Sequence, residues 1–588
     1  MRRTIARVAA VVVVVVIAAF SYPGAILISI AVHLTPTTRP SAFPVTPGGL
    51  EWLHVEHAPD MTPFIADQEG RRMLLHGAIP AGLIDFWSGT DYSVTDTPPY
   101  YPIDPAAYDG KCPANSSAIA TPPLCQDDIK RMAALGFNSL RLPMSWSLLE
   151  PERGKFSEQY IDRVAQVVGW AREAGVYVIF DMHQNAFSRY VGRSDPPPLP
   201  GGAAISLRYY TGAPRWATFT DRLPSEWYAG QREVNPAVFD ATTSFWYNRA
   251  GIQDEYIATV AHVMSRFKDD STVAGISIYN EPFPGWNLSP GFEDLLLFPF
   301  YRRVIDAITG ARDGLPCPTH VFMPAPCGYP DLGVHDLRHL VFLDAGLLRE
   351  VTDFPTHLGL PVSSYPNLVL GIHAYTHVYT IDHLIDQKTP PDKAGYPWGG
   401  YDQSYYWGER EARGIGAALF VTEFANDPGK DSTELASQLR EQEIHLTGFA
   451  FWTWMENCGG GNNKPYGVFD GIDCTTTRAQ PSSGCIRQSR AAMLARVYPE
   501  ASSDPNLTYS YDPLTGYFAM RANGKFGDPA TVVVVPSVVN GSVTVGGAVA
   551  GEPSIAQTGD GGRIVTVFPA GGEFTLNVAA APVAPFKC

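Results

Sequence analysis

Residues 273–282 read Val-Ala-Gly-Ile-Ser-Ile-Tyr-Asn-Glu-Pro, a short apolar run that ends on the carboxylate Glu281. A second run, Leu419-Phe-Val-Thr-Glu-Phe424, ends in the same way on Glu423. Runs this apolar are typical of parallel strands buried on both faces. Because the C-terminal ends of the strands in a parallel barrel open onto one face, the two carboxylates are predicted to meet there. A single Glu at a strand end is usually just solvated, so the neighbouring residues decide the interpretation.

Apolar runs of similar length recur along the chain, separated by segments with helical periodicity. They predict eight strands: Arg72 to Ile79, Phe137 to Leu142, Val176 to Met182, Val273 to Tyr279, His320 to Pro324, Leu368 to Tyr375, Ala418 to Phe424 and Thr447 to Trp454. Helices are predicted between them, for example over Ser157 to Ala174 and Asp254 to Phe267. This alternation over residues 48–498 predicts an α/β fold, a (β/α)8 TIM barrel, with a doubly wound sheet as the alternative.

The character of the chain changes beyond Tyr498. Short apolar runs separated by Gly-rich turns predict a small C-terminal β-sandwich over residues 502–588, with strands at Thr531 to Val535, Ser542 to Val545, Arg563 to Phe568 and Glu573 to Val578. A sandwich in this position either supports the barrel or binds sugar or lipid separately, and fold alone does not decide between these roles.

The N-terminal segment and the cysteines predict export. Met1-Arg2-Arg3 and the apolar stretch after it, within residues 1–34, have the pattern of a signal peptide, with an uncleaved membrane anchor as the alternative. The protein is therefore expected to be secreted or anchored in the cell envelope, outside the cytoplasm. The eight cysteines suit disulfides better than metal, since no Cys-x-x-Cys occurs. Bridges are predicted for Cys112–Cys125 and Cys317–Cys327, while three pairings stay open for Cys458, Cys474, Cys485 and Cys588.

Charge and composition narrow the classes of ligand. A formal charge of -16 argues against nucleic acid and leaves neutral or apolar substrates. An aromatic content of 12% suits stacking on sugar rings but equally suits a large core. Long polar and aromatic insertions at residues 185–248, 317–366 and 376–406 follow predicted strands, so they are expected to cover a deep site at the barrel mouth.

Polar residues recur where each predicted strand ends, which is the pattern of a barrel active site. They are Arg141, Asp181 with His183, Asn280 with Glu281, His373 with Tyr375, Glu423, and Trp454. Two carboxylates in such a setting can perform glycoside hydrolysis, in which one protonates the leaving oxygen and the other attacks the anomeric carbon or activates a water.

These motifs together resemble glycoside hydrolase family 5, the cellulase-like retaining barrels. The resemblance rests on Phe137-Asn-x-Leu-Arg141-x-Pro143, Asp181-Met-His183, Asn280-Glu281-Pro282, His373-x-Tyr375 and Phe451-Trp-x-Trp454. It implies that Glu281 is the acid/base and Glu423 the nucleophile. It also implies that Arg141, Asp181, His183, Asn280, His373, Tyr375 and Trp454 bind the substrate, with no cofactor and no metal.

Each of these candidate residues has an expected role in the reaction. Asn280 is expected to hydrogen-bond the substrate 2-hydroxyl. Arg141 and Tyr375 would keep Glu423 ionised, whereas Glu281, with fewer positive neighbours, would keep a raised pKa. Trp454 would form an apolar floor under the sugar. The remaining pair, His183 and His373, would orient sugar hydroxyls or serve only as structural hydrogen-bonding groups.

Within the family, the resemblance is greatest to the endoglycoceramidases and the related endogalactosylceramidases, which implies a glycosphingolipid substrate, contact with a membrane surface and a monomeric protein. Two positions depart from their pattern, Asn185 in place of Asp and a segment ending at Asp85 in place of one carrying a Lys, which leaves the first sugar open between glucose and galactose. The apolar run Phe292 to Tyr301 is expected to supply a wall for the lipid, with a buried helix as the alternative.

Two other functions remain open at this point. An endo-β-1,4-glucanase or mannanase acting on polysaccharide would use the same two carboxylates. A non-catalytic surface protein could bind glycolipid or glycan through an inactive barrel.

Overall fold

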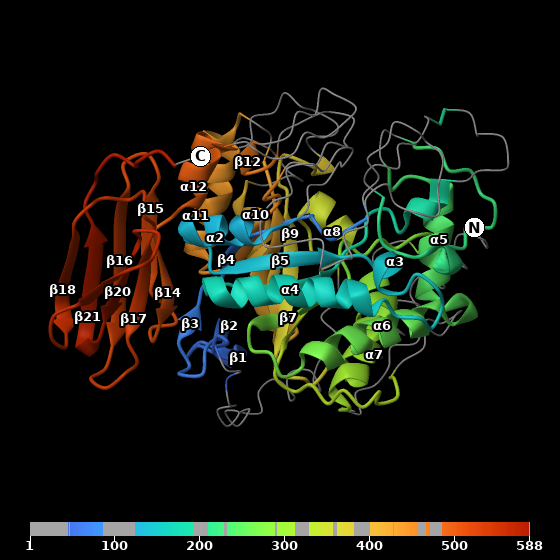
Figure 1. Ribbon diagram of the computed structural model, residues 1–588, viewed down its shortest axis with the longest axis horizontal. Coiled ribbons are helices and arrows are strands. Elements are labelled where there is room, and N and C mark those ends of the chain that lie inside the picture. Colours follow the sequence, from blue (N-terminus) through green and yellow to red (C-terminus); the bar gives the residue numbers. More distant parts are fainter. Residues whose placement is uncertain are drawn as a thin grey trace, which may run out of the picture.

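The computed structural model describes residues 45, 48–85, 124–192, 201–202, 210–228, 232–287, 291–311, 328–356, 362–381, 400–426, 429–455, 466–470 and 485–586. A barrel wrapped in helices occupies most of the molecule, and antiparallel sheets lie at one end of its long axis (Figure 1). The segment expected to be a signal peptide or anchor lies outside the described residues. Among the residues described, no helix is long and apolar enough to cross a membrane.

The predicted TIM barrel is confirmed. Eight strands form a closed barrel: β4 (His76–Ala78), β5 (Ser139–Met144), β6 (Tyr177–Met182), β7 (Val273–Ser277), β8 (Leu340–Asp344), β9 (Leu368–Ala374), β10 (Ala418–Phe424) and β11 (Gly448–Phe451). Every neighbouring pair is parallel, and the ring closes where Phe449 of β11 pairs with His76 of β4. Close approach of the strands requires glycine at Gly275, where a Cβ would collide with the Leu340 carbonyl.

Two predicted strands need correction. The strand predicted at His320 to Pro324 lies outside the described residues, and its place in the barrel is taken by β8 (Leu340–Asp344). The run Arg72 to Ile79 is divided, since β3 (Arg72–Met73) pairs with β14 (Tyr498–Ser502) in another sheet and only β4 enters the barrel. Because the fifth strand was predicted at His320 to Pro324, Asp344 at the end of β8 was not recognised as a strand-end residue.

Helices cover the outside of the barrel (Figure 1). α4 begins where the Ser157 hydroxyl accepts from the Tyr160 amide and ends at Gly175, which adopts the left-handed conformation. The helices are α2 (Gln126–Ala134), α3 (Trp146–Leu149), α4 (Glu158–Ala174), α5 (Pro236–Trp246), α6 (Ile252–Phe267), α7 (Phe298–Thr309), α8 (Leu347–Thr352), α10 (Asp402–Gly414), α11 (Ala436–Ile444) and α12 (Gln488–Leu494). Shorter turns are η2 (Arg189–Gly192), η4 (Arg215–Ala217), η5 (Arg249–Gly251), and the π-helical η6 (Glu293–Leu297) and η8 (Asp431–Leu435).

The predicted C-terminal sandwich is confirmed, and it also includes strands from the start of the chain. One sheet has the order β1 (His54–His57), β2 (Pro63–Ala66), β3, β14, β17 (Thr531–Val535), β20 (Arg563–Val567) and β19 (Ser554–Gln557). The other has the order β15 (Thr508–Asp512), β16 (Tyr517–Gly524), β21 (Pro569–Val578) and β18 (Val543–Val549). A separate small pair is β12 (Phe469–Asp470) with β13 (Cys485–Ile486). Because β3 leads directly into β4, the first sheet is tied to the base of the barrel.

The apolar run Phe292 to Tyr301 does not form an exposed wall. Phe292, Phe298, Phe300 and Tyr301 are all buried, and the segment forms η6 and the first turn of α7. The rings of Phe292 and Phe300 pack against that of Trp246, and Phe300 also packs against Tyr279. The expectation of a lipid-binding wall here is therefore wrong, and the buried-helix alternative is right.

The disulfide predictions remain predictions. Cys125 is disulfide-bonded, but Cys112, Cys317, Cys327, Cys458, Cys474 and Cys588 lie outside the described residues.

Candidate active site

The C-terminal ends of the barrel strands bring the predicted residues together. Side chains alternate in direction along a strand, so Asp181 points the same way as Ile179, and Asp344 the same way as Phe342. Ile179 and Phe342 belong to an apolar cluster that also contains Leu75, Val369 and Phe420. This packed apolar cluster fills the barrel beneath the polar residues.

Arg141 on β5 is the centre of the polar network. Its guanidinium donates to Asp181 Oδ1 at 3.0 Å, to Asn280 Oδ1 at 3.0 Å, to Asp344 Oδ2 at 2.8 Å and to Glu423 Oε2 at 3.1 Å. Arg141 and Asp181 are fully buried. Both hold other side chains of the site in place, and their direct contact with substrate stays a prediction.

Glu423 at the end of β10 is held by two donors. Tyr375 Oη donates to Glu423 Oε1 at 2.6 Å, and Arg141 donates to the other oxygen. These contacts match the expectation from the sequence. They fix both carboxylate oxygens, so the side chain has a defined direction into the site.

Glu281 follows β7 in a strained backbone conformation with a φ of 44°. Gln184 stabilises this turn, because its Nε2 donates to the carbonyl of Asn280 at 2.6 Å and to that of Glu281 at 2.9 Å. Asn280 in turn donates from Nδ2 to the Gln184 carbonyl at 3.0 Å. Strain of this kind is typical of side chains held in place for function.

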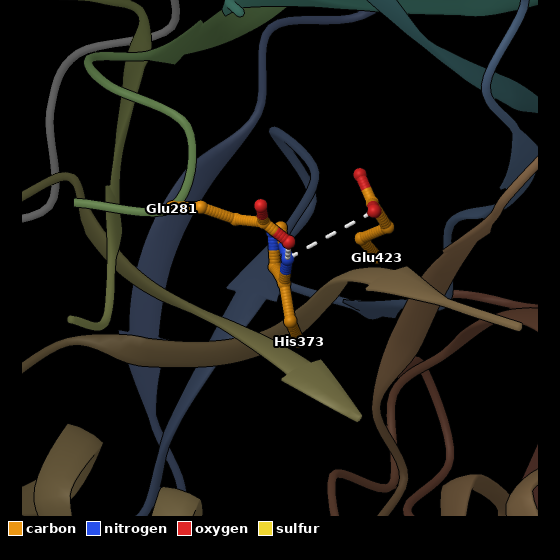
Figure 2. A group of neighbouring side chains, drawn as sticks. All are labelled: Glu281, His373 and Glu423. Carbon is orange, nitrogen blue, oxygen red and sulfur yellow. Dashed lines mark hydrogen bonds and ion pairs between the residues drawn. The ribbon is translucent and has the colours of Figure 1, made fainter. Parts of the chain in front are cut away.

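His373 on β9 lies between the two carboxylates. Figure 2 shows its imidazole with Glu281 and Glu423. Nδ1 is 3.1 Å from Glu281 Oε1 and 4.0 Å from Glu423 Oε1, while Nε2 is 3.7 Å from Asp344 Oδ2. One ligand-type atom from each of Glu281, His373 and Glu423 lies within 4.8 Å of the others. The two carboxyls are therefore close neighbours.

The carboxyls around His373 favour its protonated form. Burial would lower its pKa, but the carboxyls of Glu350, Glu423, Asp344 and Glu281 raise the pKa well above its ordinary value. The 3.1 Å contact between His373 Nδ1 and Glu281 Oε1 is a hydrogen bond, and the raised pKa of His373 favours the imidazole as its donor.

The pKa values of the two carboxyls are shifted in opposite directions. Burial alone would raise the pKa of Glu281, but the hydrogen bond from His373 and the charges of His373 and Arg232 hold it below its ordinary value. Burial raises the pKa of Glu423, and the nearby Glu281 adds to this against the charges of His373 and Arg141. Both directions differ from the expectations of a raised pKa for Glu281 and of an ionised Glu423. The pKa of Glu281 is lowered because His373 and Arg232 lie beside it, and the pKa of Glu423 is raised because burial and Glu281 outweigh Arg141 and His373.

Trp454 does not form the expected floor under the sugar. It is fully buried, and its indole Nε1 donates to Asp128 Oδ1 on α2 at 3.2 Å. Trp452, two residues earlier, is partly exposed and stacks parallel to the His183 ring, with a centroid separation of 5.7 Å and an interplanar angle of 6°. His183 is itself oriented by Asp181 through a contact of 2.8 Å from Nδ1. The aromatic surface beside the site is therefore that of Trp452.

Alanine substitution should separate these two tryptophans. Trp452→Ala is expected to lower kcat/KM by about 10- to 100-fold, the effect of losing one large aromatic contact with substrate, at a modest cost in stability. Trp454→Ala should instead cost about 3–5 kcal/mol of unfolding free energy, because it opens a core cavity and leaves Asp128 without its donor. Urea unfolding and kcat/KM measured on both variants test this. Equal loss of activity at unchanged stability for Trp454→Ala would restore the original expectation.

Four residues of the site were not among those predicted from strand ends. Asp344 was missed because its strand was misplaced, and Gln184, next to His183, was given no role. Arg232, from the insertion after β6, donates to Asn185 Oδ1 at 3.0 Å and lies 3.9 Å from Glu281 Oε2. Glu350 on α8 lies 3.7 Å from His373 Nδ1. No sequence motif marks the last two, since they arrive from an insertion and a short helix.

Comparison with known proteins agrees with this geometry. The model for "Cellulase (glycosyl hydrolase family 5)" matches residues 108–457, more than half of the 588-residue chain. A barrel with two carboxylates at its mouth defines the class, a glycoside hydrolase. The chain belongs to glycoside hydrolase family 5.

The relatives of this chain include endoglycoceramidases. The endoglycoceramidase of Cyanea nozakii is 22% identical over 408 residues, which covers 66% of this chain and 71% of the relative. Endoglycoceramidase I of Rhodococcus hoagii is 28% identical over 166 residues, 28% of this chain and 30% of that protein. The crystal structure of an endogalactoceramidase matches with a TM-score of 0.67 and 27% identity, covering 90% of this chain and 100% of its own. Endo-glycoceramidase II from Rhodococcus sp., in complex with ganglioside GM3, shares the fold, with a TM-score of 0.61 and 22% identity over 88% of this chain and 99% of its own.

Proposed function

We propose that this protein is a retaining, endo-acting β-glycosidase that hydrolyses the bond between glycan and ceramide in glycosphingolipids. The observation that carries the proposal is the pair Glu281 and Glu423, with one oxygen of each within 4.8 Å, in a chain whose relatives include endoglycoceramidases. Retaining glycosidases keep their two carboxyls about 5–5.5 Å apart, whereas inverting enzymes need room for a water between them. The spacing here supports retention.

The reaction follows from the positions of the two carboxylates. Glu423, directed by Arg141 and Tyr375, attacks the anomeric carbon and forms a glycosyl ester as the bond to the ceramide oxygen breaks. Glu281 gives that oxygen its proton, so ceramide leaves as an alcohol. Glu281 then takes a proton from water, which attacks the anomeric carbon and releases Glu423 and the intact glycan. Asn280, held by Arg141, would bind the 2-hydroxyl.

A lipid aglycone is supported by an aromatic cluster next to Glu281, formed by Phe239, Phe283 and Trp286. The turn that follows Glu281 docks on α5, where Trp246 Nε1 donates to the Phe283 carbonyl at 2.7 Å. Phe239 of α5 packs against Phe283 at 4.9 Å and against Trp286 at 4.7 Å between ring centroids. Trp286 is 53% exposed, so this cluster presents apolar surface beside the site.

Trp286→Ala is expected to weaken the preference for long alkyl chains. Each buried methylene contributes about 0.8 kcal/mol, so kcat/KM should rise roughly fourfold per added methylene until the apolar surface is covered. The variant should show a shallower rise with unchanged cleavage of a short alkyl glycoside. Kinetics on a series of alkyl glycosides measure this, with Phe526→Ala as a matched control on an 82% exposed aromatic of the sandwich. Identical slopes for wild type and Trp286→Ala would remove the cluster from the aglycone site.

The substrate itself is tested with a panel of glucosyl- and galactosyl-linked ceramides beside soluble β-glucans. Release of intact glycan and ceramide supports the proposal, and the panel also identifies the first sugar. The solved endogalactoceramidase makes galactose the candidate to test first. Equal cleavage of cello-oligosaccharides and lipid-linked glycans would support the endoglucanase alternative, and release of no sugar would support a binding protein.

The location of the enzyme is part of the same proposal. The charged and apolar N-terminal segment and the eight cysteines support export to the cell exterior or envelope. There the enzyme would act at a membrane surface as a monomer. Fractionation of cells that express the full chain tests the location, since activity confined to the cytoplasm would contradict it.

A further inference from the structure

Arg232 lies beside the carboxylate that is proposed to protonate the leaving oxygen. Its Nη2 is 3.9 Å from Glu281 Oε2, whereas the other oxygen, Glu281 Oε1, is 3.1 Å from His373 Nδ1. Because His373 occupies Oε1, Oε2 is the oxygen left to meet the leaving group. The guanidinium of Arg232 therefore lies next to the bond that is cleaved.

Two neighbours hold the side chain of Arg232 in place. Its Nε donates to the Glu233 carboxylate, and its Nη2 donates to Asn185 Oδ1 at 3.0 Å. The third nitrogen, Nη1, donates to none of the residues that the structure describes, and the side chain is 28% exposed. An arginine fixed in this way keeps N–H donors for a ligand, and its planar fork loses little conformational entropy when it binds.

The same segment carries the apolar surface proposed for the lipid. α5 begins at Pro236, shortly after Arg232, and Phe239 of this helix packs against Trp286. A set of polar donors next to the cleaved bond is thus followed along the segment by an exposed apolar cluster. That order matches a leaving group with a polar head and a hydrocarbon tail.

The charge of this pair favours a neutral polar ligand group. Glu233 balances the charge of Arg232, so an anion gains little from the guanidinium. Arginine offers only donors, so the group that it binds has to be a hydrogen-bond acceptor. In ceramide, the amide nitrogen is attached to the second carbon from the leaving oxygen, which makes the amide carbonyl a strong acceptor close to the cleaved bond.

We propose that Arg232 is a specificity-determining residue whose Nη1 donates a hydrogen bond to the amide carbonyl of the ceramide. The enzyme then selects its leaving group by a polar contact at the head as well as by apolar contacts along the tail. This inference rests on the proposed function and extends it, because it names the group of the aglycone that the site recognises.

The test compares two substrates of one glycan, a 2-acylaminoethyl glycoside and an alkyl glycoside of equal chain length. The first carries an amide at the position that it has in ceramide, and the second carries none. Arg232→Met should lower kcat/KM for both, because it also removes a charge next to Glu281. The loss for the amide substrate should be larger by at least about tenfold, the effect of losing one hydrogen bond from a charged donor.

Matched variants and a second pair of substrates serve as controls. Arg249→Met removes another arginine of the same region, paired with Asp221 at 2.7 Å, and should leave the ratio of the two kcat/KM values as in wild type. Arg232→Lys keeps the charge without the fork, so it should show a smaller loss that still falls more heavily on the amide substrate. The preference between glucosyl and galactosyl forms of one aglycone should not change in Arg232→Met.

Thermal unfolding checks that each variant is folded, and if Arg232→Met does not fold, Arg232→Lys decides by the same ratio. Equal losses on the amide and alkyl substrates would overturn the inference, because Arg232 would then act only on Glu281 or on the fold. A changed preference between glucose and galactose would also overturn it, since Arg232 would then recognise the first sugar beside Asn185. Both results leave the proposed function intact, because the wild type still cleaves. A wild type that cleaves neither substrate would overturn the proposed function together with the inference.

Discussion

Glu423→Gln and Glu281→Gln are each expected to lower turnover by at least about 10³-fold while the protein stays folded, because each removes a group that takes part in bond making or proton transfer. Their kinetics should differ. A substrate with a good leaving group should partly restore glycosyl transfer in Glu281→Gln, since its departure needs no proton. It should not help Glu423→Gln, which lacks the nucleophile.

Steady-state and single-turnover kinetics on both variants provide the measurement, with circular dichroism and thermal unfolding as the check on folding. Accumulation of a covalent glycosyl-enzyme is expected for Glu281→Gln with the activated substrate, because the second step also needs the base. Equal rescue of the two variants would contradict the assigned roles.

Arg141→Leu is expected to cost about 3–5 kcal/mol of unfolding free energy in addition to activity, because it leaves buried charges uncompensated. Asp181, Asp344 and Glu423 all pair with this one guanidinium at 2.8–3.1 Å. The unfolding free energy of Arg141→Lys should lie between those of wild type and Arg141→Leu, since lysine keeps the charge but not the planar set of donors. Urea unfolding of the three proteins at neutral pH measures these free energies.

The difference in unfolding free energy between wild type and Arg141→Leu should depend on pH, which gives a second check on Arg141. Burial would raise the pKa of Asp344, but Arg141 and His373 outweigh it and hold the pKa below its ordinary value. A carboxyl with a depressed folded-state pKa contributes stability above its unfolded pKa of about 3.9, and this is lost as the pH falls through the folded value. The difference in unfolding free energy between wild type and Arg141→Leu should therefore become smaller as the pH falls. A difference that is independent of pH would mean that Arg141 stabilises the fold mainly by packing.

Much of the fold could be predicted because its signals are local. Apolar runs of strand length identified seven of the eight barrel strands, and the change of pattern after Tyr498 identified the sandwich. The remaining strand was misplaced because two similar runs, His320 to Pro324 and Leu340 to Asp344, lie in one insertion, and periodicity alone cannot choose between them. The joining of β1 and β2 to the C-terminal sheet depends on pairing between the two ends of the chain, which no local pattern records.

The site was predictable where a strand fixes the direction of a side chain. Glu423 and His373 lie on strands, and Tyr375 directly follows one, so all three lie where expected. Trp452 and Trp454 lie two residues apart, so a continuing strand would have pointed both to the same face, and they separate only because the chain leaves the strand after Phe451. Protonation was the least predictable property, because the pKa of Glu281 depends on Arg232 and His373, which come from distant parts of the chain.

The central claim is that Glu281 and Glu423 act together in a retaining hydrolysis of a lipid-linked glycan. The most direct test is NMR of the sugar first released from a β-linked glycosylceramide, recorded before mutarotation. One oxygen of each carboxyl lies within 4.8 Å of the other, so two displacements at the anomeric carbon are predicted, with the β anomer as the first product. The α anomer as first product would contradict the account, because it would require a water between the carboxyls and a different pair of catalytic residues.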